Sequence, residues 1–119
     1  GYYDAYYNKA LKAKKLIQNA FYDALKKYDM LLGPVAPTTA LKIGESLSDP
    51  LKMYLGDIYT VMINIAGMPS MSVPCGFDKD NMPIGMQIIG KPFEEAEIMS
   101  AAKAFENVTD FHNKLPDLG

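Results

Sequence analysis

Few side chains in this sequence could act in acid–base or nucleophilic chemistry. His112 is the only histidine and Cys75 is the only cysteine. A general base must reach a nucleophile, but His112 is followed by Asn113 and Lys114, so we expect a solvated residue that interacts with the negative end of the last helix. No histidine or cation lies near Cys75 in sequence to lower its pKa, which favours a buried structural thiol over a nucleophile.

Two serines and one aspartate complete the candidates. Ser70 and Ser72 lie in a predicted strand, whereas nucleophilic serines sit at sharp turns beside a base, so structural roles are favoured. Asp57 is an acidic residue in a long apolar neighbourhood at a predicted helix start. A helix N-cap is the simpler interpretation, and the alternative is a charge-assisted hydrogen bond to a positive group of a small ligand. One carboxylate has enough acceptor positions for both.

Phosphate-binding and metal-binding patterns are absent from the sequence. Neither GxxxxGK[ST] nor GxGxxG occurs, which excludes the two commonest glycine-rich phosphate motifs. One cysteine and one histidine also exclude a cysteine-rich metal site and an internal disulfide. We therefore expect no metal site and no cofactor within this sequence.

The elements that must position these residues centre on residues 57–93. Two apolar runs, 70–75 and 84–89, flank a polar turn at 78–81. Neither run alternates cleanly between apolar and polar residues, which is typical of strands covered on both faces in a layered α/β fold. Asp57 precedes a helix predicted over 58–66, which Gly67 ends.

Helices predicted at both ends of the sequence could cover such a sheet. Residues 3–28 carry an apolar stripe at helical spacing, and residues 94–111 carry another that includes Ile98, Phe105 and Val108. A short strand is predicted at 30–32, a surface loop at 38–50 and a short helix at 51–54, which begins from Ser48-Asp49-Pro50. The order helix, strand, helix, strand, strand, helix predicts an α/β fold with a mixed sheet and helices on both faces.

Composition bounds the class of protein. The 119 residues fit one domain, and 49% apolar residues are enough for a folded core. A net charge of −2 gives no bulk attraction to nucleic acid or to an anionic membrane. No apolar run approaches the ~20 residues of a membrane helix, and no signal peptide is recognised. We expect a cytoplasmic protein.

Several segments together resemble one protein family. They are GYYDAYYNKALKAKKLI, YDMLLGPVAPTTALKIGE, DPLKMYLGDIYTVMINIAGMPSMSVPCGF, MPIGMQIIGKPFEEAEIMSAAKAFE and TDFHNKLPDL. In order and spacing they resemble the glutaminase subunits of bacterial aspartyl/glutamyl-tRNA amidotransferases, which belong to the amidase signature family. The resemblance covers essentially the whole sequence and corresponds to about the last quarter of a family member. Residues 1–119 are thus expected to be the C-terminal portion of one amidase-signature domain, an α/β/α sandwich with a mixed sheet.

The resemblance implies an enzymatic activity whose catalytic residues have no counterpart in this sequence. Family members release ammonia from glutamine with a Ser–cis-Ser–Lys triad and pass it to a second protein of the complex, the B subunit. There ATP and Mg are used to amidate Glu-tRNA(Gln) or Asp-tRNA(Asn). The segment that supplies the triad has no counterpart here, so no catalytic residue is assigned and the chain alone is expected to be inactive.

The resemblance also implies partners and one substrate-binding residue. The expected partners are the N-terminal part of the same polypeptide and the B and C subunits of the amidotransferase, with no direct contact to tRNA and none to a membrane. Asp57 matches the family aspartate that holds the α-amino group of substrate glutamine. The arginine expected to bind the α-carboxylate would lie upstream of Gly1. The rival interpretation is a non-catalytic interaction or scaffold module with the same fold and a polar surface, whereas the family interpretation predicts exposed apolar faces and self-association.

Overall fold

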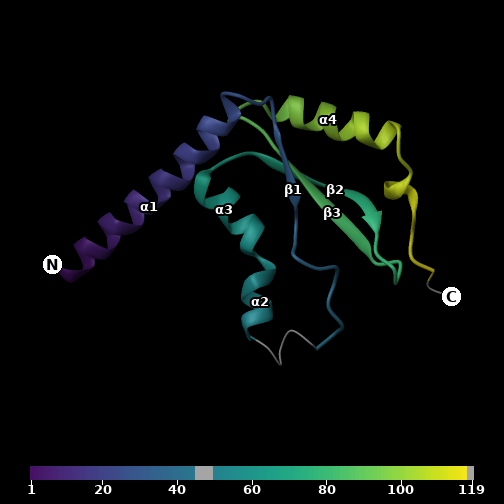
Figure 1. Cartoon of the computed structure of the whole chain (residues 1–119), viewed down its shortest axis with the longest axis horizontal. Helices are drawn as coiled ribbons and strands as arrows, with labels where there is room; N and C mark the ends of the chain where they lie inside the picture. Colours follow the sequence, from purple (N-terminus) through teal and green to yellow (C-terminus); the bar gives the residue numbers. More distant parts are fainter. Residues whose placement is uncertain (45–49, 118–119) are drawn as a thin grey trace.

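The described part of the chain forms a three-stranded sheet with helices against both of its faces (Figure 1). The computed structural model describes residues 1–44 and 50–117. In chain order the elements are α1 (Tyr2–Leu25), β1 (Leu31–Pro34), α2 (Pro50–Gly56), α3 (Ile58–Ala66), β2 (Ser70–Phe77), β3 (Pro83–Ile89), α4 (Glu95–Asn107) and the 3₁₀ turn η2 (Phe111–Asn113). The predicted α/β class is confirmed.

β3 is the central strand, in the order β1-β3-β2. Both of its pairings are antiparallel, so the described residues do not include the parallel pairings of a mixed sheet. The predicted hairpin is confirmed and is longer at both strands than the sequence pattern indicated. A β-bulge between Pro74 and Gly76 leaves Cys75 without a partner on β3.

The two faces of the sheet carry separate apolar clusters. Ile89 packs with Leu25 of α1 and Ile63 of α3. Ile88, the next residue back along β3, packs with Ile98 and Ala102 of α4. Neighbouring side chains of a strand point to opposite faces, so this split places α1 and α3 on one side of β3 and α4 on the other. The prediction of helices on both faces is confirmed.

Burial on both faces applies to β3 but not to β2. The consecutive β3 residues Gln87, Ile88 and Ile89 are all buried, whereas in β2 only Val73 is. The expectation that both strands are covered on both faces is therefore wrong for β2 within this chain. β2 is an edge strand, and its residues on the α3 face, including Ser70 and Ser72, remain exposed.

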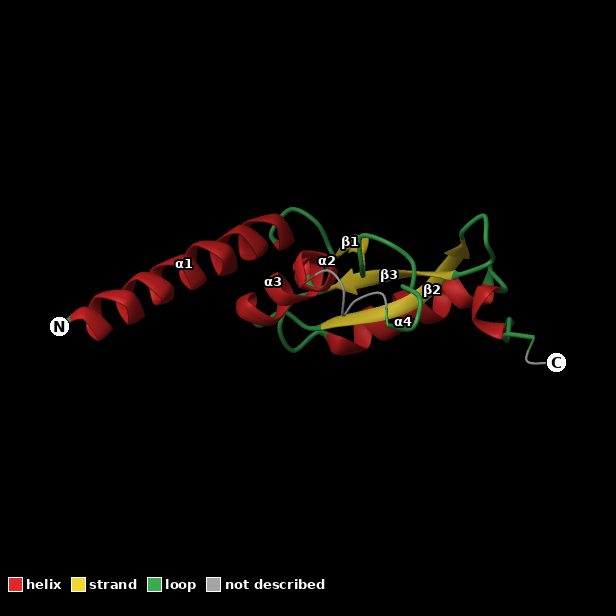
Figure 2. Cartoon of the chain, turned by 90° about the horizontal axis from the view of Figure 1, so that it is seen from below, coloured by secondary structure: helices red, strands yellow, loops and turns green. Residues whose placement is uncertain are grey.

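α1 matches the predicted long helix but packs along only part of its length. Every residue from Gly1 to Leu16 is exposed, and the one buried side chain is Leu25. Figures 1 and 2 show this first half extending away from the sheet. No helix in the described part of the chain is long and apolar enough to cross a membrane.

The ends of the other helices test the predicted start and stop signals. Gly67 closes α3 in the left-handed conformation with φ of 70°, as predicted. α4 ends at Asn107, so Val108 is 81% exposed rather than part of a buried stripe. His112 lies beyond α4 in η2, and no basic residue lies in the last turn of α4, so its predicted helix-end role is wrong.

Pro50 opens α2 as predicted, while Ser48 and Asp49 lie outside the described residues.

Docking of α4 on the sheet predicts a steric requirement at Gly90. A Cβ atom added there would lie 2.7 Å from Cγ1 of the buried Ile98. We expect Gly90→Ala to destabilise the fold by about 1–3 kcal/mol, as overpacking of cores does. Urea unfolding measures this, with Gly33→Ala as the matched control, because a Cβ at Gly33 meets nothing within 4 Å. Equal unfolding midpoints for the two variants would contradict the predicted clash.

Candidate functional site

Asp57 lies at the start of α3 with its carboxylate uncommitted to the helix. Its backbone oxygen accepts hydrogen bonds from the N–H groups of Thr60 at 3.1 Å and Val61 at 2.9 Å. Its side chain makes no capping hydrogen bond and is exposed. The predicted side-chain N-cap is therefore wrong, although the N-cap position is correct. The carboxylate remains available to bind a positive group from outside the helix.

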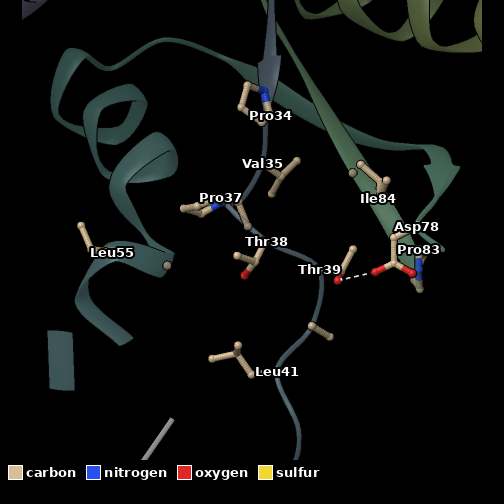
Figure 3. Close-up of a pocket in the computed structure, with 14 residues that line it drawn as sticks. Pro34, Val35, Pro37, Thr38, Thr39, Leu41, Leu55, Asp78, Pro83 and Ile84 are labelled. Atoms are coloured by element: carbon tan, nitrogen blue, oxygen red, sulfur yellow. Dashed lines mark hydrogen bonds between the residues drawn. The ribbon is translucent and has the colours of Figure 1, made fainter. Parts of the chain in front are cut away.

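A groove of about 940 Å³ lies next to this position (Figure 3). One wall is residues 34–41, the last residue of β1 and the segment after it, and another is the β2–β3 turn with the start of β3. Leu55 and Gly56 of α2 complete the lining. Gly56 directly precedes Asp57, so the groove reaches the residue before the free carboxylate. Most of the lining is apolar, and its polar side chains are Thr38, Thr39 and Asp78.

Asp78 joins two walls of the groove. Thr39 Oγ1 donates to its Oδ2 at 2.7 Å, across 39 residues of sequence. The backbone N–H groups of Asp80 and Met82 donate to its Oδ1 at 2.8 and 2.9 Å, which shapes the β2–β3 turn. Figure 3 shows the Thr39 hydroxyl pointing at this carboxylate. The aspartate therefore fixes the loop after β1 against the hairpin.

These donors shift the pKa of Asp78 below its ordinary value of 3.8, with the Thr39 hydroxyl as the largest cause and the Met82 N–H next. Hydrogen bonds to the ionised form favour it. The resulting stabilisation is fully present above the ordinary pKa and is lost as the pH falls through the lowered pKa of the folded state. Acidification therefore weakens the contact between the two walls.

Gln87 is a buried polar side chain on the face of the sheet that carries α3. It is 6% exposed, and its Nε2 donates to the carbonyl oxygens of Pro34 at 3.0 Å and Tyr59 at 3.3 Å. One amide thus connects β3 to the end of β1 and to the first turn of α3. Sequence reasoning missed both Gln87 and Asp78. For Gln87 the available signal was its place as a lone polar residue within an apolar strand, because a polar side chain needs hydrogen-bond partners when it is buried.

The other candidate residues do not assemble around Asp57. Ser70 and Ser72 are exposed on β2, and Cys75 is a half-buried free thiol at the bulge. His112 is half-buried, and its buried Nδ1 has no hydrogen-bond partner among the described residues, which corrects the expectation of a solvated residue. Across residues 1–44 and 50–117, no three His, Cys, Asp or Glu side chains are grouped as a metal site requires.

Removal of the Thr39 hydroxyl should raise the pKa of Asp78. We expect Thr39→Val to move this pKa towards its ordinary value, because the variant lacks the main donor to Oδ2. A carboxyl-carbon NMR titration of Asp78 measures the shift. Thr38→Val is the matched control, since Thr38 lines the same groove and does not bond Asp78. The same Asp78 pKa in both variants would show that the Thr39 contact has no effect on the carboxylate.

Comparison with known proteins identifies the family of this chain. Residues 1–99 match the Amidase family. The chain is 61% identical over 110 residues to the A subunit of the glutamyl-tRNA(Gln) amidotransferase of Agathobacter rectalis. That alignment covers 92% of this chain and 22% of the relative.

Solved structures give the same grouping. The crystal structure of the A subunit of glutamyl-tRNA(Gln) amidotransferase from Thermotoga maritima superimposes with a TM-score of 0.83 at 44% identity, covering 91% of this chain and 24% of that one. A bacterial aryl acylamidase of the amidase signature family superimposes with a TM-score of 0.65 at 26% identity, covering 84% of this chain and 22% of that one. The chain thus spans less than a quarter of the length of these relatives. By its sequence and its fold, the chain belongs to the amidase family.

Proposed function

We propose that this chain contributes one wall of the glutamine site in the glutaminase subunit of a tRNA-dependent amidotransferase. The observation that carries the proposal is the uncapped, exposed carboxylate of Asp57, in a chain 61% identical to the A subunit of a glutamyl-tRNA(Gln) amidotransferase. An ionised carboxylate binds an ammonium group by charge-assisted hydrogen bonds, which matches the α-amino group of glutamine. Asp57 is thereby the substrate-binding residue of the proposal.

The chemistry of the proposal depends on polypeptide beyond this chain. The Ser–cis-Ser–Lys triad that the family resemblance implies has no counterpart in this sequence, so the chain alone is proposed to be inactive. In the complete cytoplasmic assembly, ammonia from glutamine passes to the B subunit. There ATP and Mg are used to amidate Glu-tRNA(Gln) or Asp-tRNA(Asn), and the C subunit completes the complex. No tRNA contact is assigned to this chain.

Exposed apolar side chains support the need for further polypeptide. The α2–α3 apolar surface consists of Tyr54, Leu55, Ile58, Val61, Met62 and Ile65, all exposed in this chain. Tyr54 alone is 79% exposed. Several large apolar side chains on two consecutive helices indicate a surface that another part of a protein covers. A stand-alone scaffold module would have a polar surface here, so the amidase subunit is the better supported interpretation.

The α2–α3 apolar surface should make the isolated chain self-associate. We expect the solution mass, measured by light scattering over a dilution series, to exceed the monomer mass at high concentration and to fall on dilution. Val61→Lys should shift this curve towards monomer, because it places a charge on the surface. Val108→Lys is the matched control, since Val108 is equally apolar but follows α4. A monomer at every concentration would instead favour the scaffold module.

Charge removal at Asp57 tests the proposed role in substrate binding. This chain would replace the matching segment of the Agathobacter rectalis protein, assembled with its partner subunits, so that glutamine turnover can be measured. We expect Asp57→Asn to raise KM for glutamine roughly 10- to 100-fold, since a hydrogen bond to a charged group contributes about 1.5–3 kcal/mol.

The control for Asp57→Asn is Asp29→Asn, an identical change at an exposed aspartate between α1 and β1. This variant should leave KM within twofold of the unsubstituted chimaera. An unchanged KM in Asp57→Asn would remove Asp57 from the glutamine site.

A further inference from the structure

We infer that Gln87 is a positioning residue, whose side-chain amide holds the first turn of α3, and with it Asp57, at a fixed place beside the end of β1. The functional part of this inference rests on the proposed role of Asp57 in binding glutamine. The structural part rests on two hydrogen bonds and on the uneven burial of α3.

The two acceptors define the orientation of the Gln87 amide. Both partners, the carbonyls of Pro34 and Tyr59, only accept hydrogen bonds, so the NH₂ group rather than the amide oxygen must face them. Each of its two hydrogens can serve one carbonyl. Gln87 is 6% exposed, so water cannot readily replace either bond.

The two ends of α3 are held by different means. Its buried side chains, Ile63 and Ala66, both lie in the second half of the helix, within the core shared with α1. At that end Gln18 of α1 also donates to the Ala66 carbonyl at 3.1 Å. In the first turn, Ile58 and Tyr59 are exposed. Among the described residues, the bond from Gln87 to the Tyr59 carbonyl is thus the polar contact that joins this turn to the sheet.

This arrangement makes the position of Asp57 sensitive to the amide. Asp57 lies six residues before Ile63, about 9 Å along a helix axis at 1.5 Å per residue. A small tilt about the anchored end would move Asp57 by about 1 Å, and a displacement of that size in a substrate-positioning group can cost up to 10²-fold in rate. Pro34 lines the groove, so the same amide also sets the spacing between the groove wall and α3.

The test uses the chimaeric protein proposed for Asp57, with Gln87→Met and Gln18→Met as a matched pair. Each variant removes an amide that donates to an α3 carbonyl and keeps a side chain of similar length, but at opposite ends of the helix. We expect Gln87→Met to raise KM for glutamine about fivefold or more, with kcat changed less than KM. Gln18→Met should stay within twofold in KM.

A second measurement reads the position of α3 without any activity. Hydrogen–deuterium exchange of peptides that contain Thr60 and Val61, whose amides close the first turn on Asp57, should accelerate about tenfold or more in Gln87→Met and stay unchanged in Gln18→Met. If Gln87→Met does not fold, Gln87→Asn, whose amide is one methylene too short to reach both carbonyls, is read by the same measurements.

The outcomes separate this inference from the proposed function. Unchanged exchange in the first turn, or equal KM changes in Gln87→Met and Gln18→Met, would overturn the positioning role. If Asp57→Asn leaves KM unchanged, the proposed function fails, and the exchange measurement alone then decides whether Gln87 holds α3. If both roles hold, Gln87→Met combined with Asp57→Asn should raise KM no further than Asp57→Asn alone, because both act through one group.

Discussion

The pairing of β3 with a strand on each side is the constraint on which the rest of this structure depends. The backbone hydrogen bonds of a central strand are satisfied along both of its edges. What covers each face of the strand therefore depends on its side chains. Here Ile88 packs against α4, and Ile89 packs against α1 and α3. The same strand carries Gln87 on the α3 face, so the burial that forms the core also isolates the amide from water.

Local signals in the sequence predicted the elements that local chemistry controls. The apolar runs predicted the β2–β3 hairpin, and Gly67 predicted the end of α3, because a left-handed residue favours glycine. The failures lie where distant residues decide. No glycine or proline marks the end of α4, so the predicted helix continued past Asn107 to Phe111. Burial of β2 was overestimated because an apolar run does not show whether its strand lies at an edge.

The place of Asp57 at a helix start was predictable from the sequence, but the surroundings of the candidate site were not. Asp57 was identified at a helix start, and the structure shows that its carboxylate does not cap that helix. The contacts that shape its neighbourhood join residues far apart in sequence, namely Thr39 with Asp78 and Gln87 with Tyr59. Such pairs leave no periodic pattern, because a single hydrogen bond between distant segments requires only one suitable residue in each.

The two halves of α1 differ in stability, because only the second half packs against the rest of the chain. From Gly1 to Leu16 no side chain is buried, and the local contacts are between neighbouring turns, such as the Tyr2–Tyr6 hydroxyl bond at 3.0 Å and the stacked rings of Tyr3 and Tyr7. Helices held only by such contacts are marginal in water at this length. In the chain on its own, α1 therefore unravels from its free end by local opening, while the turns around Leu25 open only with the sheet.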